Sequence, residues 1–172
     1  MMKTMMKPAS LAAVVGLLAG TLMAPAQAAG TETQTFKVKL TVTSTCDIQT
    51  VAATDVNFNS HSSTEATATA DGSLTVNCTN GTAYQIGLDN GENYASGSRN
   101  MKSTSGSETV AYTLWKDVAR TKSWGDTLDS DTLSGVGTGA AQNIPVYGQV
   151  ALLAQNLKAA VYEDKVTATL TY

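Results

Sequence analysis

The chain has 172 residues, only 15% of them charged, and a formal net charge of −3. Globular domains usually carry about 25% charged residues, so this chain is poor in charge. It contains no cluster of lysine and arginine, which excludes the electrostatic footprint of a nucleic-acid-binding protein or of one held on anionic lipid. We therefore expect no nucleic acid among its partners.

The first 28 residues have the pattern of a secretory signal peptide. Lys3 and Lys7 precede a short apolar core over residues 11–23, and Ala26-Gln27-Ala28 forms a small-residue cleavage box. A membrane anchor is the alternative, but the apolar core is short for a bilayer and the cleavage box follows it closely. We predict cleavage before Ala29, and the secreted remainder suffices for one hydrophobic core but not for two domains.

Both cysteines, Cys46 and Cys78, lie in the secreted part. In an oxidising compartment two cysteines most simply form one disulfide, which stabilises a fold by roughly 3–4 kcal/mol in the chain-entropy model. Two free thiols or a metal pair are the alternatives. A zinc site needs more thiolate and imidazole ligands than a chain with one histidine and no C-x-x-C pair offers. We predict the Cys46–Cys78 disulfide, and no metal or other cofactor.

Alternation of apolar and polar side chains, which gives a strand one apolar and one polar face, recurs along the secreted part. The segments with this pattern are, in chain order, residues 36–43, 74–78, 84–88, 110–115 and 166–172. A further extended stretch is expected over residues 51–58. Residues 144–150 are predicted to form a strand that Pro145 confines to a sheet edge or a bulge. Turn signals at Asn80-Gly81 and at residues 89–91 separate several of these strands.

Composition predicts the connections between these strands. Residues 60–71 are small and polar, and residues 95–109 are rich in Ser, Gly and Thr, which indicates a flexible connection. Residues 129–143 include several glycines and are expected to form a loop, and residues 152–160 one helical turn or a loop. Short strands with turns between them predict an antiparallel all-β sandwich or barrel.

The residues offer no catalytic or ligand-binding motif, so we expect no catalytic residue. A hydrolase needs a base beside a nucleophile, but His61 lies in a Ser/Thr-rich stretch and no serine sits in a G-x-S-x-G motif. The carboxylates of residues 126–131 lack the glycine and distal glutamate of an EF-hand, and the glycines of residues 135–139 lack the lysine of a P-loop. The two tryptophans and Tyr147 are expected in the core or at its rim rather than at a sugar site.

Two of the alternating strands lack an obvious partner. The apolar face of the N-terminal one, which lies outside the disulfide loop, consists of Phe36, Val38, Leu40 and Val42. The C-terminal one ends the sequence, and its expected free edge consists of Val166, Ala168, Leu170 and Tyr172. An unpaired alternating strand is a template for pairing with another chain. The alternative is that residues 36–43 pair within their own domain.

Several segments resemble a known family in their order and spacing. They are Phe36-Lys37-Val38-Lys39-Leu40 followed by Cys46, Leu74-Thr75-Val76-Asn77-Cys78, the run from Val110 to Thr121, Ile144-Pro145-Val146-Tyr147-Gly148, and Tyr162-Glu163-Asp164 through to Tyr172. Together they cover nearly the whole secreted part. They resemble the spore coat protein U domain, which is found in subunits of archaic chaperone–usher pili.

This resemblance implies an incomplete immunoglobulin-like β-sandwich that lacks its last strand. In that family the gap is filled first by a periplasmic chaperone and then, in donor-strand exchange, by the N-terminal extension of the next subunit. Carried over to this sequence, residues 1–28 are the signal peptide, residues 29–43 the donor extension with the donor segment at 31–43, and residues 44–172 the sandwich domain. The acceptor groove is then bordered by the last strand.

The resemblance also implies a function. It suggests a non-enzymatic structural subunit of a surface pilus that supports adhesion and biofilm formation. The implied partners are a periplasmic chaperone, an outer-membrane usher, and copies of the same chain or other pilus subunits. Two alternatives stay open, namely a spore or cell-surface coat protein that forms no pili, and a monomeric secreted binding module.

Overall fold

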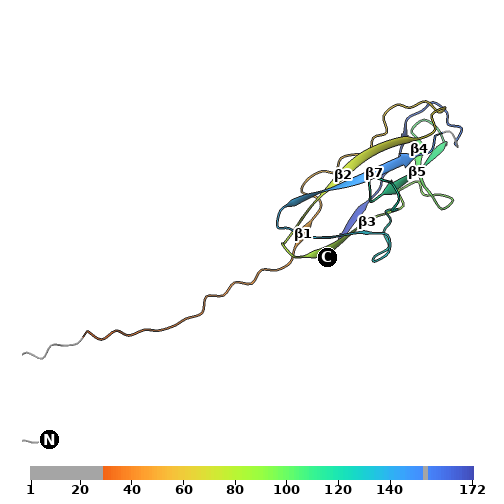
Figure 1. Cartoon of the computed structure of the whole chain (residues 1–172). Helices are drawn as coiled ribbons and strands as arrows, with labels where there is room; N and C mark the ends of the chain where they lie inside the picture. Colours follow the sequence, from red (N-terminus) through yellow and green to blue (C-terminus); the bar gives the residue numbers. More distant parts are fainter. Residues whose placement is uncertain (1–28, 153–154) are drawn as a thin grey trace, which may run out of the picture. The chain divides into compact units, whose positions relative to one another are not determined.

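The computed structural model describes residues 29–152 and 155–172, and the chain divides into two units, one ending at Leu40 and the other running from Thr41 to Tyr172 (Figure 1). The predicted signal peptide lies outside the described residues. Residues 29–40 contain no helix or strand. Nowhere in the described part of the chain is a helix long and apolar enough to cross a bilayer.

The unit from Thr41 to Tyr172 is a sandwich of two antiparallel sheets, which confirms the predicted all-β fold (Figure 1). Within the described residues the larger sheet has the order β1-β2-β7-β5-β4-β8 and the smaller one β6-β3-β9. The strands of the larger sheet are β1 (Cys46–Asp47), β2 (Ala68–Cys78), β4 (Arg99–Ser103), β5 (Thr109–Trp115), β7 (Ala141–Val150) and β8 (Tyr162–Glu163). Those of the smaller sheet are β3 (Ala83–Leu88), β6 (Leu133–Val136) and β9 (Ala168–Thr171).

The ladder between β2 and β7 is the longest in the sandwich, and runs from Ala68 opposite Val150 to Asn77 opposite Ala141. β2 begins in the stretch that was expected to be a polar connection. Its first residues are small and show no apolar alternation, but β7 supplies a backbone hydrogen-bond partner for them. A ladder that depends on a distant strand leaves little trace in local composition.

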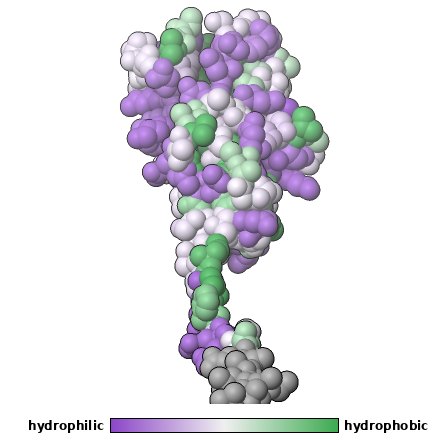
Figure 2. All heavy atoms as spheres, turned by 90° about the vertical axis from the view of Figure 1, so that its left-hand side faces the viewer, coloured by the Kyte–Doolittle hydropathy of each residue, from purple (hydrophilic) through white to green (hydrophobic). Residues whose placement is uncertain are grey.

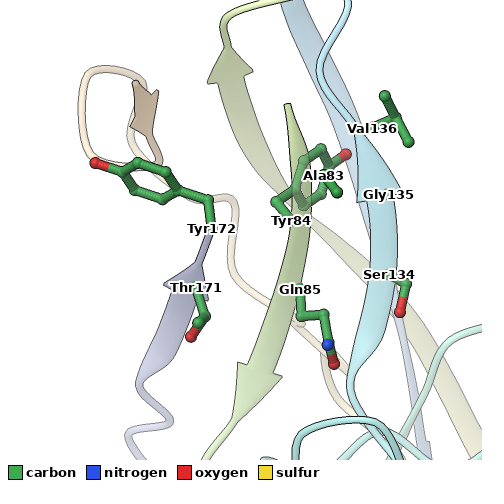
Figure 3. Close-up of a pocket in the computed structure, with 8 residues that line it drawn as sticks. All are labelled: Ala83, Tyr84, Gln85, Ser134, Gly135, Val136, Thr171 and Tyr172. Carbon is green, nitrogen blue, oxygen red and sulfur yellow. The ribbon is translucent and has the colours of Figure 1, made fainter. Parts of the chain in front are cut away.

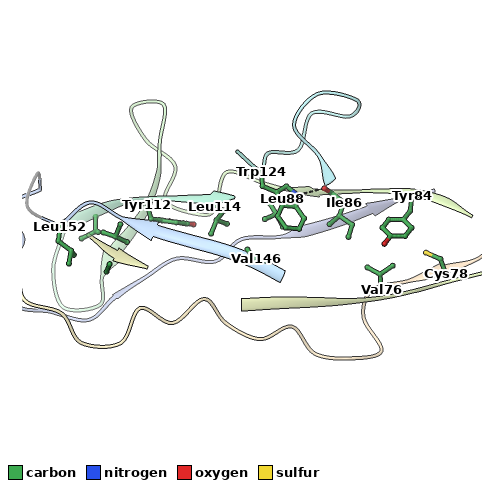
Figure 4. Close-up of a cluster of buried hydrophobic side chains, with 13 residues drawn as sticks. Val76, Cys78, Tyr84, Ile86, Leu88, Tyr112, Leu114, Trp124, Val146 and Leu152 are labelled. Carbon is green, nitrogen blue, oxygen red and sulfur yellow. Dashed lines mark hydrogen bonds between the residues drawn. The ribbon is translucent and has the colours of Figure 1, made fainter. Parts of the chain in front are cut away.

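The hydrophobic core lies between the two sheets (Figure 4). Alternate residues of β3 and β5 point into it, as their period of two predicts. Trp124 is completely buried, and its Nε1 donates a 2.8 Å hydrogen bond to the carbonyl oxygen of Ile86, which is also completely buried. The expectation that this tryptophan fills the core is therefore confirmed.

The predicted disulfide between Cys46 and Cys78 is present. The two cysteines lie directly opposite each other in the pairing of β1 with β2, and Cys78 is buried. The disulfide therefore links β1, the first strand of the sandwich, to β2, which forms the longest ladder.

Two predicted loops contain strands instead. β4 lies within residues 95–109 and pairs with β5, and β6 lies within residues 129–143 and pairs with β3. The two predicted loops are rich in Ser and Gly, which lowers their intrinsic strand propensity. Pairing of β4 and β6 with a neighbouring strand outweighs that preference. The stretch expected to be one helical turn or a loop falls partly on residues 153–154, which lie outside the described residues, and the remainder of residues 152–160 contains no helix.

Pro145 was predicted to confine its strand to a sheet edge or a bulge. β7 lies between β2 and β5 and pairs with β2 without a bulge, so the strand as a whole is neither. Pro145 stands opposite Ser73, whose N–H and carbonyl bond Thr54 on the far side of β2. The nitrogen of Pro145 therefore points away from β2. On that other side the pairing with β5 ends at Tyr147, so the missing N–H of proline costs no ladder hydrogen bond.

Candidate functional site: an apolar groove beside the last strand

The predicted donor segment is exposed. Residues 29–45 contain no strand, and Phe36, Val38, Leu40 and Val42 are 85%, 87%, 87% and 71% exposed. Figure 2 shows hydrophobic side chains following one another along this segment. Exposed large apolar side chains in a regular row mark a surface that binds a partner.

A groove of about 1120 Å³ opens in the sandwich. Its apolar lining includes Leu88, Met101, Val110, Leu114, Val146 and Val150. One rim is formed by residues 53–63, and the other by residues 157–164 together with Val166 and Ala168. Small-molecule pockets usually measure about 300–1,000 Å³, so this groove has room for a larger occupant.

One rim of the groove carries a free strand edge. β9 is the last strand of its sheet and, among the described residues, pairs with β3. The N–H of Asp89 donates to the carbonyl oxygen of Thr167 at 3.0 Å, so Thr167 directs its backbone groups toward β3. Because these groups alternate sides along a strand, Val166, Ala168 and Leu170 direct theirs outward. These are residues of the expected free edge.

The side chains of the four predicted edge residues do not share one site. Val166 and Ala168 line the groove, and Leu170 packs against the core without lining it. Tyr172, which is 62% exposed, lines a separate hollow of about 570 Å³ at the end of β3, β6 and β9 (Figure 3). Tyr84 lies in that hollow with its ring over Gly135, and burial raises the pKa of its hydroxyl.

The opposite rim, residues 53–63, is here called the strap. Val56 and Phe58 are half-buried in it and pack against the core. Thr54 exchanges backbone hydrogen bonds of 2.9 and 3.2 Å with Ser73, but within the described part of the chain residues 55–61 make no backbone–backbone hydrogen bond. The sequence predicted an extended stretch over residues 51–58 but no role for it. The alternation of Val56 with Phe58 was the available signal.

A polar cluster closes one end of the groove. The Tyr112 hydroxyl, in the groove lining, donates a 2.6 Å hydrogen bond to Oδ2 of Asp164 on the rim. Oδ1 of Asp164 accepts hydrogen bonds from the backbone N–H and Nδ2 of Asn93, at 3.1 and 2.8 Å. Burial, followed by the hydrogen bond to Asp164, raises the pKa of Tyr112. The hydroxyl therefore stays protonated and holds Asp164, which directly follows β8, in place.

His61, on the rim of the groove, forms a local contact. Nδ1 of His61 lies 2.8 Å from Oε2 of Glu65, and this hydrogen bond holds the pKa of Glu65 below its usual range. Glu65 also accepts the N–H of Ser62. Among the described residues no three His, Cys, Asp or Glu side chains are grouped as metal ligands would be.

Solved structures of pilus assembly complexes contain similar chains. The CsuC-CsuE chaperone–tip adhesion subunit pre-assembly complex, from the archaic chaperone–usher Csu pili of Acinetobacter baumannii, matches with a TM-score of 0.57 and 25% identity over 77% of this chain and 41% of that chain. A chaperone–tip adhesin complex of CFA/I fimbriae biogenesis matches with a TM-score of 0.37 and 18% identity over 74% of this chain and 41% of that chain.

A curated protein is also similar to this chain in sequence. Protein U of Myxococcus xanthus is 35% identical over 107 residues, which amount to 59% of this chain and 59% of that protein. The matches thus span less than two thirds of the length of these relatives. The sequence profile of the Spore Coat Protein U domain matches residues 32–169, which is most of the chain, and the protein therefore belongs to the Spore Coat Protein U domain family.

Proposed function

We propose that this protein is a structural subunit of a surface pilus, assembled by the chaperone–usher pathway through donor-strand exchange. Residues 31–43 of one copy fill the groove of the next. A periplasmic chaperone occupies the groove before assembly, and an outer-membrane usher receives the subunit. The polymer supports adhesion and biofilm formation.

The observation that carries the proposal is an apolar groove beside a free strand edge, in a chain that also has an exposed alternating segment. The two β2 residues that line the groove, Ala68 and Leu74, lie six residue steps or about 20 Å apart. From Phe36 to Val42 is also six steps. A strand laid in the groove can thus place its four apolar side chains along the whole apolar lining.

The energetics favour this occupant. Burying each of the four donor side chains would contribute about 1.5–3 kcal/mol. Each ladder hydrogen bond gained at the edge of β9 adds roughly 1 kcal/mol net. The polar face of the donor carries Lys37 and Lys39, which stay in solvent while the apolar face is buried. The match to a chain from an archaic chaperone–usher assembly complex supports the same reading.

The test compares two charge substitutions on opposite faces of the donor. Leu40→Asp places a carboxylate on the apolar face, and the matched control Thr41→Asp places the same carboxylate on the polar face. The secreted protein is run on SDS gels, heated and unheated. Wild type and T41D should give ladders of multimers that collapse to one band on heating, and L40D should give a monomer. Unchanged polymer in L40D contradicts the donor assignment.

A coat protein that forms no pili is the second candidate, favoured by the family match and by the similarity to Protein U. Electron microscopy of intact cells separates the two. Thin fibres support the pilus, and an amorphous layer supports the coat. A wild-type chain that is secreted as a stable monomer without any chaperone would instead be a self-contained binding module.

A further inference from the structure

The inner faces of β2 and β7 each have a gap in their row of side chains. On β7, Val146 and Val150 are buried on either side of Gly148, and on β2, Gly72 is buried between Ala70 and Leu74. β2 and β7 are neighbours (Figure 1). Ala70 of β2 lies opposite Gly148 of β7. The two glycines therefore leave adjacent notches in a wall that is otherwise covered by side chains.

The strap fills both notches. A methyl group at Gly148 would overlap Cγ1 of Val56 and would lie 2.9 Å from Cζ of Phe58. A methyl group at Gly72 would lie 2.5 Å from the carbonyl oxygen of Thr54 and 2.9 Å from Cγ2 of Val56. Carbon atoms that are not bonded normally stay about 3.5–4.0 Å apart, so no side chain fits at either glycine while the strap is in place.

The strap is attached to the sheet mainly by the packing of its side chains Val56 and Phe58 against the two glycines. Beyond the Thr54–Ser73 pair, the described hydrogen bonds of residues 55–59 are local. Asn59, with a φ of 59°, donates its N–H to Oδ1 of Asn57 at 2.8 Å. A segment with so few backbone hydrogen bonds has low local stability. The position of this rim therefore depends on how well Val56 and Phe58 fit their notches.

We propose that Gly72 and Gly148 are positioning residues of the groove, which seat Val56 and Phe58 so that the strap stands at the distance a single extended strand requires. This proposal rests on the proposed function, since its ligand is an extended peptide with alternating apolar side chains, supplied by a second copy of this chain. Filling a notch displaces the strap and narrows or misaligns the groove, while the two sheets keep their pairing.

The experiment measures binding of a fluorescent peptide of residues 31–43 to the secreted chain. All variants are made in the L40D chain, whose own donor is blocked and whose groove is intact. Gly148→Ala should weaken peptide binding about tenfold or more, and Val56→Ala should weaken it as well, because the first overfills the notch and the second empties it. The double variant G148A/V56A should bind more tightly than G148A alone, since the added methyl group replaces what Val56 lost.

The control is Gly106→Ala, at an exposed loop glycine whose close neighbour is the flexible carboxylate of Glu108. It should bind the peptide as the parent does. If the L40D parent itself fails to bind, the proposed function fails with this inference. If the parent binds and G148A binds equally well, the inference alone is overturned.

The inference can still be tested if G148A does not fold. V56A adds no bulk, and Val56 is half-buried, so the fold of this variant is expected to persist, as tryptophan fluorescence would report. If G148A does not fold and V56A binds as tightly as the parent, the strap has no positioning role and the inference is wrong. Weakened binding by folded V56A supports it.

Discussion

Tyr112 and Asp164 join the lining of the groove to its rim through a 2.6 Å hydrogen bond. The same carboxylate accepts two hydrogen bonds from Asn93, and Gly91, with a φ of +79°, lies so close to Asp164 that a methyl group there would overlap the carboxylate. Asp164 immediately precedes the segment that leads into β9. The carboxylate of Asp164, just before the free strand edge, is thus held by Tyr112 on one oxygen and by Asn93 on the other.

Removing the Tyr112 hydroxyl should loosen this end of the groove. Tyr112→Phe leaves Oδ2 of Asp164 without its hydroxyl donor, and a hydrogen bond to a charged group contributes about 1.5–3 kcal/mol. We expect the free energy of unfolding in urea at pH 7 to fall by that amount. The control Tyr94→Phe removes a half-exposed hydroxyl and should change stability by less than about 0.5 kcal/mol. Equal losses in both variants would contradict the role given to the Tyr112–Asp164 bond.

Arg99 should matter more than any surface cation. It is only 9% exposed, and its guanidinium donates to the carbonyl oxygens of Leu88, Asp89 and Trp124 at 2.7, 2.8 and 2.8 Å. Arg99→Met leaves all three without this donor, at about 1–3 kcal/mol each, so urea unfolding should show a loss of at least about 3 kcal/mol.

Lys165→Met is the control for Arg99→Met. Lys165 is an exposed residue whose Nζ lies 3.1 Å from Oε1 of Glu92. Exposed ion pairs contribute at most about 1 kcal/mol, so the loss should stay below that value. A comparable loss in both variants would show that the three carbonyl oxygens do not depend on Arg99.

The strands predicted from alternation were β3, β5, β9 and most of the second half of β2, because their apolar residues repeat with a period of two and face one core. β4 and β6 were missed for a common reason. Each is short and lies in a stretch rich in Ser and Gly, and each forms because a neighbouring strand offers it backbone partners. Local sequence therefore predicts which side chains are buried better than it predicts which strands pair through their backbones.

The groove could be foreseen only in part. The exposed alternating face at Phe36 to Val42 and the strand that ends the chain were visible as patterns. The strap could not be predicted from the sequence. Its position depends on the glycines at 72 and 148, which are remote in sequence from Val56. A single glycine in a strand suggests close backbone approach but does not say which segment approaches.

Acid should remove the stabilisation that Asp89 provides. Burial opposes ionisation of this carboxyl, but hydrogen bonds from Thr167 and from the N–H of Gly91 outweigh it and lower the pKa below the ordinary 3.8. Since the native pKa lies below the unfolded one, the stabilisation is complete above about pH 4 and is lost as the pH falls through the native pKa. The difference in unfolding free energy between wild type and Asp89→Asn should therefore be constant from pH 7 to 5 and shrink below pH 4.

The neighbouring substitution Asn90→Ala serves as the control for that pH series. It perturbs the same turn without removing an ionisable group, so its difference from wild type should not change with pH. If the wild-type and D89N curves stay parallel down to pH 3, the carboxylate of Asp89 is not stabilised by the bonds to the start of the last strand.

The disulfide should contribute stability without shaping the groove. It joins cysteines 32 residues apart at the pairing of β1 with β2, and none of the residues lining the groove is a cysteine. The chain-entropy model predicts a loss of about 3–4 kcal/mol on reduction. Urea unfolding of the oxidised and dithiothreitol-reduced wild type measures it, and the Cys46→Ala/Cys78→Ala variant, which should be insensitive to dithiothreitol, controls for other effects of the reductant. Coincident midpoints for oxidised and reduced wild type would contradict the prediction, because the disulfide would then add nothing to the free energy of unfolding.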